Sequence, residues 1–184
     1  MSFVALLWLP ILASAVLVFV LSAATHMVLP WHKDEWGRIA DQEKVQAALG
    51  GLAPGLYAFP AAPGQRQQMT KEWMDRWAKG PSGWLTVAAP SPISMGRNLG
   101  LSFLVFLGVS FVVAYVAAHA LGPAPHYRAV FRIVGTVGVL SYAVGPVFNS
   151  IWYSRPWRAY AADLLDALIY GLAMAGVFGW LWPR

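Results

Sequence analysis

The sequence predicts an all-α membrane protein in which four transmembrane helices carry a small α+β polar insert between the first two. Two observations support this fold class. The 184-residue chain is 58% hydrophobic and only 11% charged, whereas soluble domains carry about 25% charged residues. Four apolar stretches are also each close to the roughly 20 residues that a helix needs to cross a bilayer core. We therefore expect the chain to lie in lipid.

The first apolar stretch runs from about Phe3 to Ala24 without a charged residue. A cleaved signal peptide would have a basic start and an apolar run of roughly 7–15 residues, and this stretch has neither. We expect a retained transmembrane helix over residues 1–25. Pro30 follows within the sequence HMVLPWHKDEW, and it ends the helix because it lacks a backbone donor and disfavours helix at the preceding residue.

The polar insert, residues 26–97, is expected to form two short helices and two short strands. Asp41 and Thr70 are the expected N-caps of the helices in ADQEKVQAALGG and TKEWMDRWAKG, and glycine follows each helix. The stretches GLYAFP and GWLTVAAP are predicted as strands, and one crossover helix between them favours a parallel pair. Two strands alone are marginal in water, so we expect the insert to rest on the membrane surface or on a partner.

The third region, residues 98–184, contains the other three spans, at about 99–120, 133–153 and 160–182. Basic residues flank the spans on both sides of the membrane. On the side of the insert they are Lys33, Arg38, Arg97, Arg155 and Arg158, and on the other side Arg128, Arg132 and Arg184. The positive-inside rule therefore favours a cytoplasmic insert.

Small residues recur at four-residue spacing in the last two spans. They are Gly171, Ala175 and Gly179 in the fourth span, and Ser141 and Gly145 in the third. In lipid, such faces allow helix backbones to approach closely. Internal packing of one four-helix bundle is the favoured interpretation, and a homo-oligomer or a face for a protein partner is the alternative.

The stretch HMVLPWHKDEW contains the residue types of a metal site, namely His26, His32, Asp34 and Glu35. Pro30 separates the two histidines, however, and their spacing matches no familiar ligand pattern. The favoured interpretation is the end of a membrane helix without chemistry of its own. On that interpretation Trp31 and Trp36 lie at the headgroups, while the acids face water or pair with Lys33 and Arg38. We expect no metal, cofactor or catalytic residue.

A second polar group lies in the last two spans and comprises Asp163, Asp166, Asn149 and Ser150. Acids within a membrane span are costly and are functional candidates by default. The two aspartates lie in the first turns of their helix, where the helix dipole favours anions, and Arg155 and Arg158 are near in sequence. A structural anchor and an ion-binding role therefore both remain open.

Several stretches of the chain resemble an uncharacterised family of small four-helix bacterial inner-membrane proteins. They are HMVLPWHKDEW, GLYAFP, PSPISMGRNLG, FNSIWYSRPW and DLLDALIYGLAMAGVFGWLWP, in the same order over most of the chain. The resemblance implies a multi-pass protein of the bacterial inner membrane with four helices. It implies no activity and no site residues.

The sequence contains no motif from which an enzymatic activity could be named. The chain has no Walker loop, dinucleotide fingerprint, HExxH motif or nucleophile elbow. It has no cysteine, which excludes disulfides and thiolate sites. The net charge of +5 fits contact with anionic lipid rather than with nucleic acid. The favoured hypothesis is a non-catalytic accessory or scaffold subunit of a larger membrane assembly. The alternative is a small ion- or proton-handling membrane protein that uses Asp163 and Asp166.

Overall fold

The computed structural model describes residues 2–62, 64, 66, 70–122 and 124–183, which form a mainly helical structure with one two-stranded sheet. The chain divides into two compact units. The helical unit comprises Met1–Trp36 and Ser94–Arg184, and the insert unit comprises Gly37–Ile93. Residues 26–36 and 94–97, assigned to the insert from the sequence, therefore group with the helices. Arg184, one of the flanking charges counted above, lies outside the described residues.

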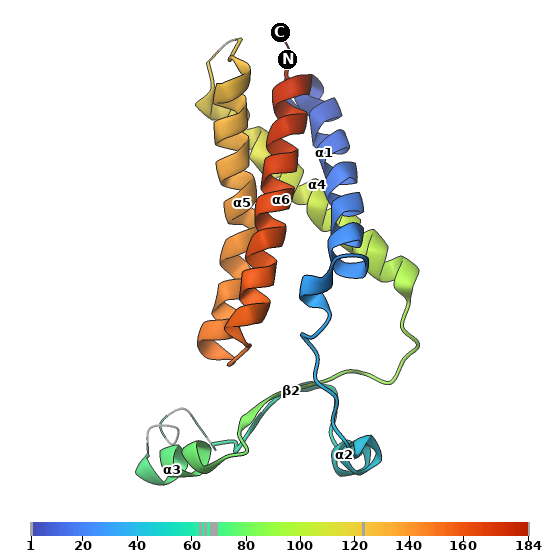
Figure 1. Ribbon diagram of the computed structural model, residues 1–184, viewed down its shortest axis with the longest axis vertical. Helices are drawn as coiled ribbons and strands as arrows, with labels where there is room; N and C mark the ends of the chain where they lie inside the picture. The colour runs from blue at the N-terminus through green and yellow to red at the C-terminus, as the bar shows by residue number, and fades with distance from the viewer. Residues whose placement is uncertain (1, 63, 65, 67–69, 123, 184) are drawn as a thin grey trace. The chain divides into compact units, whose positions relative to one another are not determined.

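Four helices of the described chain are long and apolar enough to cross a membrane, as the sequence predicts (Figure 1). They are α1 (Phe3–Met27), α4 (Met95–Ala120), α5 (Tyr127–Trp152) and α6 (Trp157–Leu181). Helix α5 begins earlier than expected because His126 caps it: the backbone N–H of Ala129 donates to His126 Nδ1 at 3.2 Å. Arg128 and Arg132 therefore lie inside the helix rather than before it.

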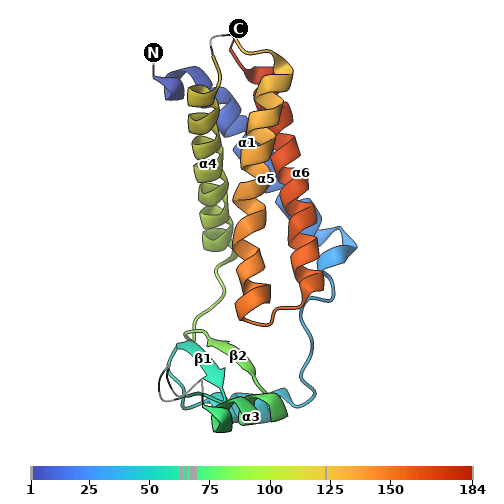
Figure 2. The same cartoon turned by 90° about the vertical axis from the view of Figure 1, so that its left-hand side faces the viewer.

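Helices α5 and α6 run side by side in opposite directions and form the most extensive contact between two elements (Figures 1 and 2). Glycines allow this close approach. A Cβ added at Gly138 would lie 3.1 Å from Gly171 Cα, and one added at Gly135 would lie 3.3 Å from Ala175 Cβ. Gly179 contacts Tyr127 at the end of the same interface. The small residues of α6 thus face α5.

Ser141 and Gly145 of α5 lie outside this contact. A Cβ added at Gly145 would meet nothing within 4 Å. Ser141 is exposed, and its hydroxyl donates to the carbonyl of Val137 in its own helix at 2.7 Å. The glycines of α5 that contact α6 are Gly135 and Gly138. They are three residues apart, so the helical repeat places both on the face of α5 that packs against α6.

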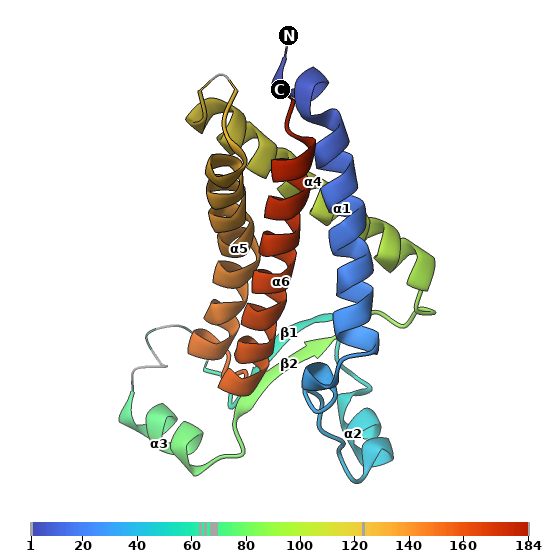
Figure 3. The same ribbon diagram turned by 45° about the horizontal axis from the view of Figure 1, so that its top comes forward.

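Helix α1 packs against both α4 and α6, so its buried face joins the helices into one core (Figure 3). Leu7 and Val18 of α1, Val113 of α4 and Met174 and Phe178 of α6 are fully buried members of this core. The start of α1 and the end of α6 lie at one end of the helical unit, as Figure 1 shows. The end of α1 and the start of α6 therefore lie at the opposite end.

The insert unit contains the elements that the sequence predicts. Helix α2 (Gln42–Leu49) is capped by Asp41, helix α3 (Lys71–Lys79) is capped by Thr70, and each helix ends at a glycine. Strands β1 (Gly55–Phe59) and β2 (Gly83–Val87) also match the prediction. These helices, strands and caps are confirmed.

The predicted parallel pairing of the two strands is wrong, because β1 and β2 are antiparallel (Figure 2). The connection between them starts and finishes at the same end of the sheet. Near that end the Trp77 ring lies 5.6 Å from the Trp84 ring, and the Trp73 indole N–H donates to the carbonyl of Pro60 at 3.2 Å. Packing of α3 at this end of the sheet brings the chain back without a crossover.

Candidate functional site

The chain turns back onto α6 immediately after it leaves α1. Pro30 begins a short 3-10 helix, η1 (Pro30–His32), which contacts α6. Proline is suited to the first position of a helix because the missing N–H has no partner there. Polar side chains of α1, η1 and α6 consequently meet at one end of the helical unit.

Asp166 lies at the centre of this meeting point, and its side chain is only 6% exposed. The indole N–H of Trp31 donates to Asp166 Oδ1 at 3.1 Å. The hydroxyls of Tyr170 and Thr25 donate to Asp166 Oδ2 at 2.9 and 3.1 Å. A buried carboxylate is tolerated only with such partners, so three separate elements fix the position of this one.

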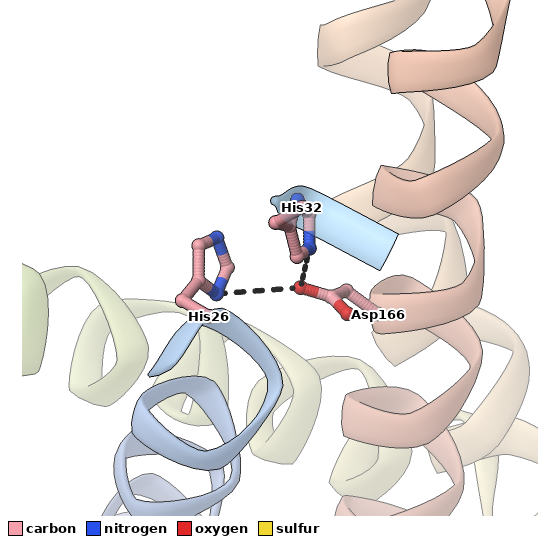
Figure 4. Close-up of side chains that lie close together, drawn as sticks. All are labelled: His26, His32 and Asp166. Atoms are coloured by element: carbon pink, nitrogen blue, oxygen red, sulfur yellow. Dashed lines mark hydrogen bonds and ion pairs between the residues drawn. The ribbon is translucent and has the colours of Figure 1, made fainter. Parts of the chain in front are cut away.

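Two histidine rings face the same carboxylate oxygen, as Figure 4 shows. His32 Nε2 lies 3.2 Å from Asp166 Oδ2, and His26 Nδ1 lies 3.6 Å from it. The two rings are stacked, with their centroids 4.2 Å apart and an angle of 11° between their planes. The His32 side chain is 8% exposed and that of His26 is 54% exposed. His26 therefore forms the accessible side of the site.

Glu35 holds the opposite nitrogen of His32, with Oε1 2.6 Å from Nδ1. Arg155, in the turn between α5 and α6, links this carboxylate to Asp163. Its Nη2 donates to Glu35 Oε2 at 3.4 Å and to Asp163 Oδ1 at 3.2 Å, and its Nη1 donates to Asp163 Oδ2. We call these residues together the Asp166 cluster: Thr25, His26, Trp31, His32, Glu35, Arg155, Asp163, Asp166 and Tyr170.

The Asp166 cluster carries an excess of negative charge. Glu35, Asp163 and Asp166 contribute three negative charges and Arg155 one positive charge, so two negative charges remain before the histidines are counted. Burial lowers the pKa of His32, but its hydrogen bonds with Glu35 and Asp166 outweigh burial and raise the pKa above its ordinary 6.5. The hydrogen bond with Asp163 likewise raises the pKa of Arg155. The surroundings thus favour positive charge.

The structure brings together only part of the polar residues singled out in the sequence. Asp163 and Asp166 meet His26, His32 and Glu35 in one cluster. Among the remaining candidates, Asp34 is exposed and lies beside Arg158, whose Nη2 donates to the Asp34 carbonyl at 2.9 Å.

Asn149 and Ser150 do not join the two aspartates through any side-chain hydrogen bond within the described part of the chain. Asn149 is exposed, and its carbonyl accepts the backbone N–H groups of Tyr153 and Arg155 at the end of α5. The Ser150 hydroxyl is buried, with no hydrogen-bond partner among the described residues.

The expected environment of HMVLPWHKDEW requires correction. Glu35 pairs with His32 and Arg155 rather than with Lys33 or Arg38. Trp31 points to Asp166, while Trp36 is 89% exposed. These partners lie as far as 135 positions away in the sequence, so local spacing does not reveal them. The signal that the sequence does contain is topology. Two spans, an even number, separate residues 26–36 from the start of α6, so both lie on the same side of a membrane.

Comparisons of the chain with models of protein families, with curated proteins and with solved structures find no match. Its function therefore has to be inferred from the Asp166 cluster and from the surfaces of the helices.

Proposed function

We propose that this chain is a small ion-handling protein of the bacterial inner membrane, and that it binds a cation at the Asp166 cluster. The observation that carries the proposal is the buried Asp166 carboxylate, on which donors from α1, η1 and α6 converge. Ionisable residues within membrane spans are rare and mark ion pathways or binding sites by default. The bacterial location is supported by the resemblance described above.

Stability alone is a weak reason for such a cluster. Replacing buried ion pairs by well-packed apolar residues is often neutral or stabilising by about 1–4 kcal/mol. The cluster also has the properties that a cation site needs. Its balance of charge is negative, and the half-exposed His26 borders the buried Asp166, which gives a cation an approach from the surface.

The test is ion flux in proteoliposomes that contain the purified chain. Dyes sensitive to protons, to alkali cations and to divalent cations are each enclosed in the vesicles. We expect uptake of one cation class by the wild-type chain, and uptake near that of empty vesicles for Asp166→Asn, which keeps the size of the side chain but removes its charge. Asp34→Asn is the matched control, because Asp34 is exposed outside the cluster. Absence of wild-type flux, or equal flux in Asp166→Asn, would refute the proposal.

The second candidate function is a non-catalytic accessory or scaffold subunit, working as a homo-oligomer or beside a protein partner. It is favoured by small residues that face outward. A Cβ added at Gly96 or Gly100 of α4, or at Gly145 of α5, would meet nothing within 4 Å. Small residues on a lipid-facing surface allow a second helix to approach closely.

Native mass measurement after gentle detergent extraction separates this candidate from the first. We expect a complex larger than one chain, and its dissociation in Gly100→Leu, where the larger side chain blocks close approach. A lone monomer under every extraction condition would contradict the accessory function. It would leave the ion-handling proposal to the flux assay.

We also propose that residues 37–93 lie on the cytoplasmic side, which is supported by the basic residues that flank the spans there. Because the chain has no cysteine, single introduced cysteines report orientation cleanly. In intact cells, a membrane-impermeant maleimide is expected to label Gly122→Cys, between α4 and α5, and to leave Gln46→Cys of α2 unlabelled. The opposite pattern would reverse the orientation.

A further inference from the structure

We propose that the Asp166 cluster binds one divalent transition-metal ion through His26, His32 and Asp166, an inference that rests on the proposed cation-binding function and names its cation. One ligand atom from each of these three residues lies within 4.8 Å of the other two. Figure 4 shows the arrangement, with the Asp166 carboxylate of α6 directed toward the rings of His26, at the end of α1, and His32, in η1.

The spacing of the donor atoms fits a metal ion. In a tetrahedral zinc site with bonds of about 2.0–2.1 Å, neighbouring ligand atoms lie about 3.3 Å apart. Asp166 Oδ2 lies 3.2 Å from His32 Nε2 and 3.6 Å from His26 Nδ1. The stacked rings have to separate for both nitrogens to face one ion. His26 Nδ1 lies 3.1 Å from both the Ser22 carbonyl and Thr25 Oγ1, and it has to exchange these contacts for the ion. Three protein ligands leave a fourth position open to water or to another small ligand.

The residues behind the ligands also fit a metal site. A histidine that binds a metal almost always donates its other N–H to a carboxylate, a carbonyl or water, which fixes the ring and its tautomer. His32 has this arrangement, because Nδ1 lies 2.6 Å from Glu35 and Arg155 in turn holds Glu35. The Trp31 indole binds Asp166 Oδ1. Oδ2 accepts hydrogen bonds from the Thr25 and Tyr170 hydroxyls and also faces the two histidines. His32 and Asp166 are therefore oriented before an ion arrives, and the His26 ring turns to complete the site.

A second group of possible ligands, His32 with Glu35 and Asp163, is less suitable. The Arg155 guanidinium already lies between the two carboxylates of that group, and its charge would repel a metal ion. No such cation stands between Asp166 and His26 within the described part of the chain. A divalent ion there would neutralise the two negative charges that Arg155 leaves unbalanced.

The ligand types select the class of metal. Two imidazole nitrogens and one carboxylate oxygen suit zinc or ferrous iron. Calcium and magnesium prefer sites built from oxygen ligands only, and this site has a majority of nitrogen ligands. We therefore expect Zn²⁺, and its spectroscopic substitute Co²⁺, to bind, and Mg²⁺ and Ca²⁺ to compete poorly.

The test is equilibrium binding of Zn²⁺ and Co²⁺ to the full chain in lipid nanodiscs, prepared without a histidine tag and first stripped with a chelator. We expect one ion per chain by elemental analysis, and a Co²⁺ absorption spectrum with the intensity of four-coordinate cobalt. Glu35→Gln is expected to weaken binding about 10–100-fold, as for other residues that support a ligand. His26→Ala removes a ligand and is expected to weaken binding further.

His26→Ala is the decisive variant because its side chain is half exposed, so its loss is compatible with folding, which size-exclusion chromatography checks. His119→Ala is the matched control: it also removes one exposed histidine, from the far end of α4, and is expected to bind Zn²⁺ like the wild type. Binding that is absent in the wild type, or equal in His26→Ala and His119→Ala, would overturn the metal site. Asp166-dependent flux of another cation in proteoliposomes made from the same purified protein would then leave the proposed function standing, and absence of that flux would remove both.

Discussion

Replacing Gly171 by alanine tests the close contact of α5 and α6 directly. The added Cβ would lie 2.5 Å from Val139 Cγ2 and 2.6 Å from Val139 N. The side-chain atom has room to move, but the backbone nitrogen moves only if the whole helix moves. Ordinary contact begins at 3.4 Å, so the helices have to separate locally by roughly 0.8 Å, the difference between 3.4 and 2.6 Å. The neighbouring pair Gly138 and Gly171 would then lose its close approach.

The expected cost combines two opposing effects. Overpacking of a well-packed interface costs about 1–3 kcal/mol, while alanine is more favourable than glycine inside a helix by roughly 0.5–1 kcal/mol. Gly176→Ala, on the same helix, isolates the second effect because a Cβ there meets nothing within 4 Å. Gly171→Ala is therefore expected to be less stable than Gly176→Ala by about 1–3 kcal/mol.

Reversible unfolding in mixed detergent micelles measures this difference. Tryptophan fluorescence follows the loss of packing between helices, and circular dichroism checks that the helices themselves persist. The comparison is between the two alanine variants rather than with the wild type, so the gain in helix propensity cancels. Equal stability of Gly171→Ala and Gly176→Ala would refute the close contact of α5 and α6 at this position.

Three further predictions concern single side chains. Trp31→Phe removes a donor to the buried carboxylate of the Asp166 cluster and should destabilise the helical unit by about 1.5–3 kcal/mol. Thermal unfolding should be almost unchanged in Trp36→Phe, and equal effects of both variants would contradict the cluster. Trp77→Ala removes the ring contacts with Trp73 and Trp84, each worth about 0.5–1.5 kcal/mol, and should speed amide hydrogen exchange in β2. Unaltered exchange would show that α3 does not support the sheet. Hydrogen bonds from Lys44 lower the pKa of Asp41 below its ordinary 3.8, so the Asp41 cap of α2 is fully present above pH 3.8 and is lost as the pH falls through the lowered pKa. The chemical shift of the Lys44 amide should follow this transition, and a midpoint at or above pH 3.8 would contradict the prediction.

Elements that depend on local signals could be predicted from the sequence. Asp41 and Thr70 accept hydrogen bonds from the backbone N–H three residues later, and this is the interaction that the capping pattern predicts. The relative direction of β1 and β2, antiparallel rather than parallel, could not be predicted from local signals. It depends on where Trp73 and Trp77 pack after the chain has folded, and strand patterns alone do not contain that information.

The candidate site could be predicted only in part. Asp166 stands out because it is an acid in an apolar segment. Its pairing with His32, 134 positions earlier, depends on the path of the chain after α1. In the sequence, Pro30 indicates that the two histidines do not share one helix, and ligand spacing rules assume one continuous helix. In the structure the same proline starts the turn that stacks the His26 and His32 rings.

The antiparallel pairing of β1 and β2 determines how the chain can be cut and rejoined. Gly55 faces Val87 across the sheet, so the backbone enters and leaves it only about 5 Å apart. The segment between these residues, which contains the sheet and α3, is therefore joined to the rest of the chain at two neighbouring points. Such a lobe can grow, shrink or be exchanged without altering the two segments that connect it to α1 and α4. A short link from Pro54 to Ala88 would therefore delete the sheet and α3 and leave both connecting segments at their present lengths.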